Sequence, residues 1–192
     1  AYCEEIRAKV ANLSALGEPI RVLLDKRPGK ATQKRWAWVK KGAPVILEVG
    51  GRDMAENKVS VIRRDRLWND AAKVNFAPTD REEFAGSVAA LLEDIQNALH
   101  DEAAARRDAN IVRGVTSMDD LAAHFADGNK YPGWVELGWS RPTGEELEAV
   151  VAKLKTLKLT IRNTPMDAGT PSGQCLFTGK PAVETIYVAR AY

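Results

Sequence analysis

The sequence predicts an α/β protein made of two small domains, each a mixed sheet with helices packed on it, joined by a long helix. Short apolar runs alternate with helical patterns over the first 66 residues, which is typical of α/β folds. One unbroken helical pattern covers residues 80–110, and a second strand-and-helix series follows it to the C-terminus. A length of 192 residues is sufficient for two small domains. We expect them at 1–75 and 111–192, with the connecting helix within 76–110.

The first domain is predicted to begin with a helix and to continue with three strands and a second helix. Ile6, Val10 and Leu13 recur at i, i+4 and i+7, and Gly17 marks the end of this first helix. Because such a helix usually follows a strand of the sheet, we expect the strand that opens this domain to be missing, before residue 1. The later elements are a strand at 19–25, a helix at 31–42, a strand at 43–50, a polar turn at 51–57 and a strand at 58–64.

The second half is predicted from the same kinds of pattern. The long helix carries one apolar stripe, formed by Phe84, Val88, Leu91, Leu92, Ile95 and Leu99. The elements after it are a strand at 110–115, a helix at 118–126, a strand at 133–139, a helix at 145–156 and strands at 157–163 and 183–189.

The composition indicates the cellular compartment in which we expect the protein. The longest apolar runs, such as PVILEV at 44–49, are too short to span a bilayer, and no charged-then-apolar leader is present. Cys3 and Cys175 are two cysteines far apart in sequence, which gives no disulfide framework. We therefore expect a cytoplasmic protein without a membrane contact.

Positive charge is concentrated in one block. Residues 21–66 hold 13 Lys or Arg and 5 Asp or Glu, a net charge of +8 in a chain whose total is only +2. Such a block inside a near-neutral chain is typical of a phosphate-binding surface. The alternative is a set of solvated helix faces that happen to carry lysines.

The segments VLLDKR and KRWAWVKKGAPVILEVGGRDMAENKVSVIRRD resemble the anticodon-binding domain of prolyl-tRNA synthetase, a class II aminoacyl-tRNA synthetase. The matching pattern is a strand with D-x-R, a basic and aromatic helix with W-x-x-K-G-x-P, and a strand followed by G-R-D. The pieces GWVEL, TIRNTPMD, GQCLFTG and VARAY are similar to the C-terminal domain of the archaeal and eukaryotic-type branch of that enzyme. The resemblance implies a tRNA-binding portion that recognises the anticodon of proline tRNA.

The basic block contains the candidate RNA-binding residues. Lys34, Trp38 and Lys41 share a helix face, and Arg35 lies close to it. Trp38 is expected either to stack on a base or to pack on the sheet, whereas Trp36 is expected to point towards a core.

Arg27 and the pair Arg52 and Asp53 follow predicted strands, where open α/β sheets bind ligands. Arg52 suits a guanine edge or a phosphate. Asp53 suits a guanine edge, or it simply forms the turn. The remaining arginines, Arg63, Arg64 and Arg66, contact phosphate or lie in solvent.

The resembled branch commonly carries four zinc-binding cysteines, and the resemblance places them at Ser140, Glu145, Cys175 and Thr178. A structural zinc site needs four good donors in a tetrahedral array. One thiol, one carboxylate and two hydroxyls do not supply them, so we predict a degenerate site without structural zinc. Cys175 is then a small buried hydrophobic residue.

The resemblance also implies what lies beyond this chain. The motifs that bind ATP and Mg²⁺ and activate proline are not found here, so we predict no catalytic residue and an inactive fragment of a proline–tRNA ligase. Its partners would be proline tRNA and the enzyme's own catalytic domain, in a parent that is a homodimer. The C-terminal Tyr192 would be directed towards that active site, or would fray. The alternatives are a free-standing RNA-binding or regulatory module and a purely structural interaction module.

Overall fold

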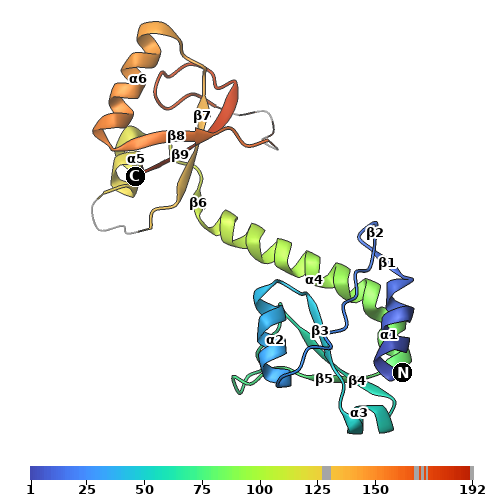
Figure 1. Cartoon of the computed structure of the whole chain (residues 1–192). Coiled ribbons are helices and arrows are strands. Elements are labelled where there is room, and N and C mark those ends of the chain that lie inside the picture. The colour runs from blue at the N-terminus through green and yellow to red at the C-terminus, as the bar shows by residue number, and fades with distance from the viewer. Residues whose placement is uncertain (127–130, 167–168, 170, 172, 191–192) are drawn as a thin grey trace. The chain divides into compact units, whose positions relative to one another are not determined.

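The computed structural model describes residues 1–126, 131–166, 169, 171 and 173–190. The chain divides into two compact units, residues 1–103 and 104–192 (Figure 1). Each unit combines helices with a β-sheet, which confirms the predicted α/β class. No helix in the described part of the chain has the length and apolar character needed to cross a membrane.

The first unit is built on a three-stranded antiparallel sheet in the order β3-β4-β5. These strands are β3 (Val45–Glu48), β4 (Lys58–Arg63) and β5 (Ala77–Asp80). Because side chains alternate along a strand, Val59 and Val61 of the central strand point to one face and are buried there.

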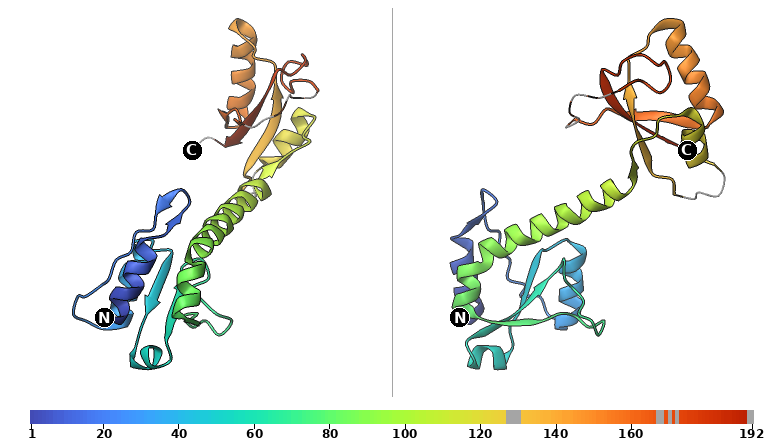
Figure 2. Two further views of the ribbon diagram at one scale, coloured as in Figure 1. Left: turned by 90° about the vertical axis from the view of Figure 1, so that its right-hand side faces the viewer. Right: turned by 180° about the vertical axis from the view of Figure 1, so that it is seen from behind.

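Helices cover both faces of this sheet. The helices α1 (Tyr2–Ala11) and α4 (Arg81–Ala109) lie side by side against one face, as the two views in Figure 2 show. The buried residues of this core are Ile6, Val10, Val59, Val61, Phe84 and Val88. The helix α2 (Ala31–Lys40) is on the opposite face, where Arg35 bonds to Glu48 of β3.

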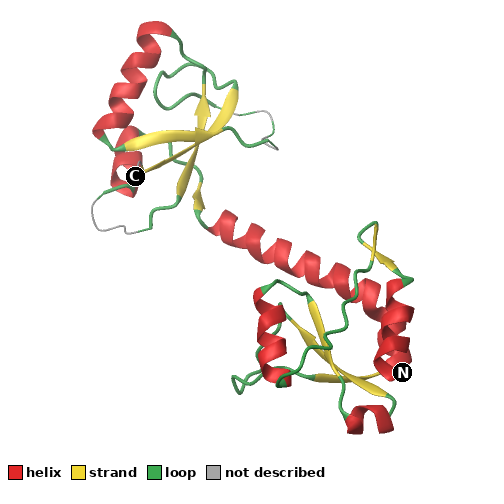
Figure 3. Ribbon diagram, viewed as in Figure 1, coloured by secondary structure: helices red, strands yellow, loops and turns green. Residues whose placement is uncertain are grey.

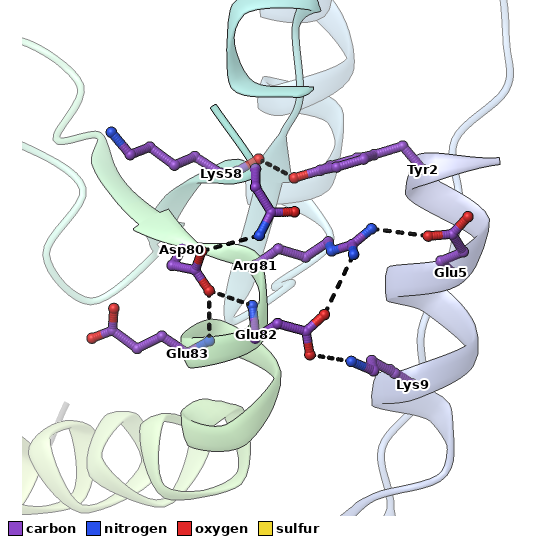
Figure 4. A network of polar contacts seen from close by, with 9 residues as sticks. Tyr2, Glu5, Lys9, Lys58, Asp80, Arg81, Glu82 and Glu83 are labelled. Carbon is purple, nitrogen blue, oxygen red and sulfur yellow. Dashed lines mark hydrogen bonds and ion pairs between the residues drawn. The ribbon is translucent and has the colours of Figure 1, made fainter. Parts of the chain in front are cut away.

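The start of α4 is tied to α1 by a polar network (Figure 4). Arg81 donates to Glu5 at 2.9 Å, and its guanidinium lies over the ring of Tyr2. Lys9 pairs with Glu82. Asp80 caps the helix by accepting from the backbone amides of Glu82 and Glu83, which satisfies donors that the first turn leaves unpaired.

The first predicted helix is shorter than expected. It ends at Ala11, and a small hairpin follows, with β1 (Ser14–Ala15) paired to β2 (Glu18–Pro19). Leu16 and Gly17 form its two-residue turn, both with positive φ, as a hairpin of this length requires. The apolar spacing extended the helix prediction across this turn.

The predicted strand at 19–25 is wrong. After Pro19 the chain continues as a loop up to α2 (Figure 3). Ile20 and Val22 still pack against the core of the first unit. The apolar composition of this segment therefore predicted correctly that its side chains pack against the core. It does not predict whether the backbone has a neighbouring strand with which to form hydrogen bonds.

Two further elements of the first unit differ from expectation. The polar segment predicted as a turn contains the short helix α3 (Gly51–Ala55). The strand β5 was not predicted, since Pro78 and a lack of alternation conceal it. Proline is tolerated there because β5 is an edge strand, paired only with β4 among the described strands.

The second unit confirms the order and type of the elements predicted for it, but the strand predicted at 110–115 is reduced to two residues. A four-stranded sheet has the order β6-β7-β9-β8, with one parallel pair and two antiparallel pairs. Its elements are β6 (Ile111–Val112), α5 (Met118–His124), β7 (Trp134–Trp139), α6 (Gly144–Thr156), β8 (Leu159–Asn163) and β9 (Glu184–Arg190).

Both helices of the second unit contribute to a single core. Leu121 of α5 and Val150 of α6 pack in one cluster with the alternate residues Val135 and Ile186 of the sheet. Gly138 is required in β7, because a Cβ atom there would lie 2.8 Å from the Cβ of Ala182. The chain around Ala182, just before β9, can therefore approach the sheet closely at this position.

Candidate nucleic-acid interface

Asp25 organises the loop that leads into α2. Its Oδ2 atom accepts from the indole Nε1 of Trp38 at 2.8 Å. Arg27 donates to the same carboxylate through its guanidinium, at 2.9 and 2.6 Å, and through its backbone amide at 3.1 Å. One carboxylate therefore fixes both an arginine and a tryptophan that were predicted to contact RNA.

These bonds also fix the charge of Asp25. The hydrogen bonds from Arg27, and then that from Trp38, hold the pKa of the carboxyl well below its usual range. This interaction stabilises the fold above about pH 4, the ordinary value for an unfolded aspartate, and is lost as the pH falls through the lower folded pKa. Its four acceptor positions are occupied, so Asp25 positions its neighbours and has no acceptor left for a base.

Two lysines complete this arrangement. The Nζ atom of Lys41 lies 4.6 Å from the centre of the Trp38 ring, and that of Lys34 donates to the backbone oxygen of Asp25 at 3.4 Å. The guanidinium of Arg27 is 5.7 Å from the same ring. The structure thus brings four predicted site residues together around Asp25, which was not predicted as a site residue. We call these five residues the Asp25 cluster: Asp25, Arg27, Lys34, Trp38 and Lys41.

Arg35 has a different environment. It donates to Glu48 through two nitrogens, at 2.6 and 3.0 Å, and its guanidinium lies 4.8 Å from the ring centre of Phe76. Only 11% of its side chain is exposed. The structure therefore places Arg35 between α2 and the sheet, with its charge compensated.

Arg52 and Asp53 lie on α3, apart from the Asp25 cluster. The side chain of Arg52 is 89% exposed and pairs with Glu56. Asp53 accepts from the backbone amide of Gly50 at 2.7 Å and from the hydroxyl of Ser60 at 3.2 Å. Its carboxylate thus closes the start of α3, as the turn-forming alternative expected.

The three arginines at the end of β4 and just after it differ in exposure. Arg63 bonds to Asp65 at 2.7 Å and to Asp94 at 2.6 Å. Arg66 lies 3.9 Å or more from the same carboxylates, and Arg64 is exposed. Arg63 is therefore a structural residue of the first unit.

The residues that sequence reasoning missed are Asp25 and Trp68. Asp25 is the first residue of the D-x-R pattern, and an acid two residues before an arginine was a usable signal. Trp36 was expected to point towards a core, but the structure places it elsewhere. Its ring lies 5.6 Å from that of Trp68, which is itself 56% exposed.

One protein family model matches the first unit, which carries the Asp25 cluster. Residues 1–98, just over half of the chain, match the model of the family described as anticodon binding domain. The chain belongs to the anticodon binding domain family. The resemblance inferred from KRWAWVKKG and its neighbours is confirmed to that extent.

Relatives of this anticodon binding domain are longer proteins. The chain is 66% identical over 192 residues to a proline–tRNA ligase of Novosphingobium aromaticivorans, covering all of this chain and 37% of that protein. It is 55% identical over 193 residues to a proline–tRNA ligase of Erythrobacter litoralis, covering 38% of that protein. The chain thus spans a little over a third of the length of these relatives.

A solved structure shows the same fold. The prolyl-tRNA synthetase of Cryptosporidium parvum, crystallised with halofuginone and AMPPNP, aligns with a TM-score of 0.73 at 22% identity. The alignment covers all of this chain and 36% of that one. Both units of the chain therefore have a counterpart in that structure.

The second unit lies beyond the residues matched by the anticodon binding domain model, and it contains the predicted remnant of a zinc site. Ser140 and Thr178 share a hydrogen bond of 2.9 Å between their hydroxyls. Cys175 is buried beside them, within the core. Glu145 is exposed in the first turn of α6. Three of the four positions are thus brought together.

The thiol of Cys175 is held by polar neighbours. Burial raises its pKa, but hydrogen bonds from Thr178 and Ser140 outweigh this effect and leave the pKa below its usual value. The hydroxyl groups of Ser140 and Thr178 thus lie against the sulfur and against each other. In the described residues, no group of three or more His, Cys, Asp or Glu side chains is placed to hold a metal ion.

The absence of structural zinc remains a prediction with a direct test. We expect purified protein to contain less than about 0.1 zinc per chain, and a strong chelator to shift its thermal midpoint by less than about 1 °C, because a structural zinc contributes folding energy outright. Metal analysis and thermal unfolding with and without chelator measure both. Stoichiometric zinc, or a clear loss of stability on chelation, would contradict it.

Tyr192, the residue expected to be directed towards an active site, lies outside the described residues.

Proposed function

We propose that this chain is the tRNA-binding portion of a proline–tRNA ligase, and that the Asp25 cluster contacts the anticodon loop of proline tRNA. The supporting observation is the convergence of Arg27, Lys34, Trp38 and Lys41 around Asp25. An anticodon loop presents unstacked bases and closely spaced phosphates, which proteins bind by stacking and by hydrogen bonds to base edges.

Within the cluster, Arg27 is the residue best placed to bind a base. A guanidinium has five N–H donors in a fixed plane, and Asp25 takes only two of them. The other three remain for a guanine edge or a phosphate, with the plane of the group already oriented. Fixing a donor before binding reduces the entropy lost on binding, which favours affinity and specificity together.

The lysines are suited to the backbone of the RNA. The side chain of Lys41 lies over Trp38 on an exposed surface, from which its flexible stem can turn towards a phosphate. Trp38 then offers its ring face to a base. Arg52, exposed on α3, supplies a further phosphate contact in this proposal, whereas Asp53 maintains the start of that helix.

Further assignments concern the second unit and the full-length enzyme. We propose that the second unit corresponds to the C-terminal domain of the archaeal and eukaryotic-type branch, supported by the meeting of Ser140, Cys175 and Thr178. ATP, Mg²⁺ and proline would be bound by the catalytic domain of the full enzyme, a cytoplasmic homodimer that attaches proline to its tRNA. Tyr192 would approach that domain.

A binding experiment tests the proposed function. We expect the chain to bind a proline tRNA transcript and to prefer it at least tenfold over transcripts with altered anticodon bases, since one well-placed pair discriminates by about that much. The proposal places four cations on the single-stranded anticodon loop: Arg27, Lys34, Lys41 and Arg52. Four such contacts predict that the affinity falls roughly 50-fold between 50 and 200 mM salt. Filter binding measures both.

The outcomes of this experiment are separable. Equal affinity for every transcript would refute anticodon reading, and an affinity that does not change with salt would refute the phosphate contacts. A transcript of an unrelated tRNA with the same length serves as the control for general attraction to RNA.

A further inference from the structure

A second aromatic surface involves α2 and shares no residue with the Asp25 cluster. Trp68 belongs to the hairpin at 66–76 that connects β4 to β5, and its ring lies 5.6 Å from that of Trp36 on α2, tilted by 33°. Trp68 is 56% exposed. Tryptophan usually contributes through the large area it buries, so a tryptophan ring left this exposed requires an explanation. We call Trp36 and Trp68 the aromatic ledge.

The hairpin presents Trp68 in a fixed position. Asn69 donates through its backbone amide to Lys73, and Asn75 to Leu67, both at 2.9 Å. Trp68 is bridged to Val74 across the hairpin. The side chain of Asn69 also accepts from two amides of the turn, at 3.1 and 3.0 Å. The exposed ring is therefore carried by a hydrogen-bonded turn, so little order has to be gained on binding.

Basic residues lie close to this ledge in the sequence. Residues 63–76 contain four Lys or Arg and two Asp or Glu, and Asp65 is already bonded to Arg63. Lys40 follows Trp36 by one helical turn and is exposed. Among the described residues, Lys40, Arg64 and Lys73 have no ion-pair partner. Three such cations against one exposed carboxylate, Asp70, leave this region of the sequence net positive, which suits a base and its phosphate.

The geometry of α2 separates this ledge from the Asp25 cluster. Trp36 and Trp38 are two residues apart, so they point roughly 200° apart around the helix axis. An α-helix with its side chains is only about 10–12 Å wide, and a loop of several unpaired nucleotides can contact both sides of one. Charge and this shared helix favour RNA over an apolar protein partner.

We propose that Trp36 and Trp68 form a stacking platform for an unpaired nucleotide of the bound tRNA, separate from the nucleotide contacted by the Asp25 cluster. This inference rests on the proposed function. Stacking on an aromatic side chain is tolerant of sequence, because every base has a π-face. The ledge therefore adds affinity without reading the anticodon, whereas the Asp25 cluster discriminates among bases.

Three substitutions of Trp68 test the platform, each in the complete 192-residue chain. We expect Trp68→Ala to weaken binding about tenfold for proline tRNA and for transcripts with altered anticodons alike. Trp68→Leu retains an apolar contact with Trp36 but has no π-face, so we expect the same loss. Trp68→Phe retains stacking and should lose less than about threefold.

The controls separate this inference from the proposed function and from misfolding. Trp134→Ala removes an exposed ring of the second unit that lies 5.4 Å from Tyr187, and we expect it to leave RNA affinity unchanged. Circular dichroism confirms that each variant is folded. If Trp68→Leu binds as tightly as the wild type while the chain still prefers the native anticodon, the ledge is overturned and the proposed function stands. If the wild type binds no transcript, both are overturned.

Discussion

Replacing Asp25 with asparagine is expected to reduce the preference for the native anticodon about tenfold, the value of one well-oriented base contact. Asparagine has one acceptor oxygen where aspartate has two, and its NH₂ group opposes an N–H of either Arg27 or Trp38. One of these two side chains then loses its fixed orientation. Filter binding to matched and altered transcripts measures the change.

The sign of the change in general affinity makes this test specific. Asp25→Asn removes one negative charge, so attraction to phosphate increases and the affinity for altered transcripts at low salt should not fall. Glu93→Gln on α4 is the matched control. Glu93 is exposed and its substitution changes the net charge equally without touching the cluster. A uniform loss of affinity for all transcripts would show that Asp25 acts only through stability.

The fold of the second unit was readable from sequence because each element there agrees with its local signals. Ser117, for example, caps α5 by accepting from the amide of Asp120 at 3.0 Å, as the spacing of a capping box indicates. In the first unit local and tertiary signals diverge. Residues 20–25 have the composition of a strand but belong to none of the described strands, and strand pairing is not encoded locally.

The sequence predicted which types of residue form the candidate site better than it predicted which of these residues lie together in the structure. Lys34, Trp38 and Lys41 follow from helical spacing alone, and the structure places all three at the Asp25 cluster. Arg35 has the same charge and lies next to them in sequence, yet its direction is set by Glu48, a residue of β3. Which cations are neutralised depends on contacts between elements, and these appear only in three dimensions.

Substituting Arg35 with alanine is expected to lower the free energy of unfolding of the first unit by about 3 kcal/mol. The side chain of Arg35 is 11% exposed and that of Glu48 is 25% exposed, and removing one partner of a mostly buried pair leaves the other charge uncompensated. Contact with Phe76 is also lost. Hydrogen exchange of the amides in β3 and β4 measures this stability for the first unit by itself.

Two comparisons show whether the loss arises from burial of the pair. Arg52→Ala breaks an arginine–glutamate pair on the surface and should leave the exchange of the same amides unchanged, because an exposed ion pair adds little to stability. Arg35→Ala combined with Glu48→Ala should cost clearly less than the two single changes added together, because the double variant leaves no unpaired charge. Lys34→Ala serves as a reference variant that removes one proposed RNA contact. If Arg35→Ala leaves hydrogen exchange unchanged but reduces RNA affinity as much as Lys34→Ala does, then Arg35 is an RNA contact instead. The ion pair with Glu48 would then have to open on binding, and Glu48 would need another cation in the complex.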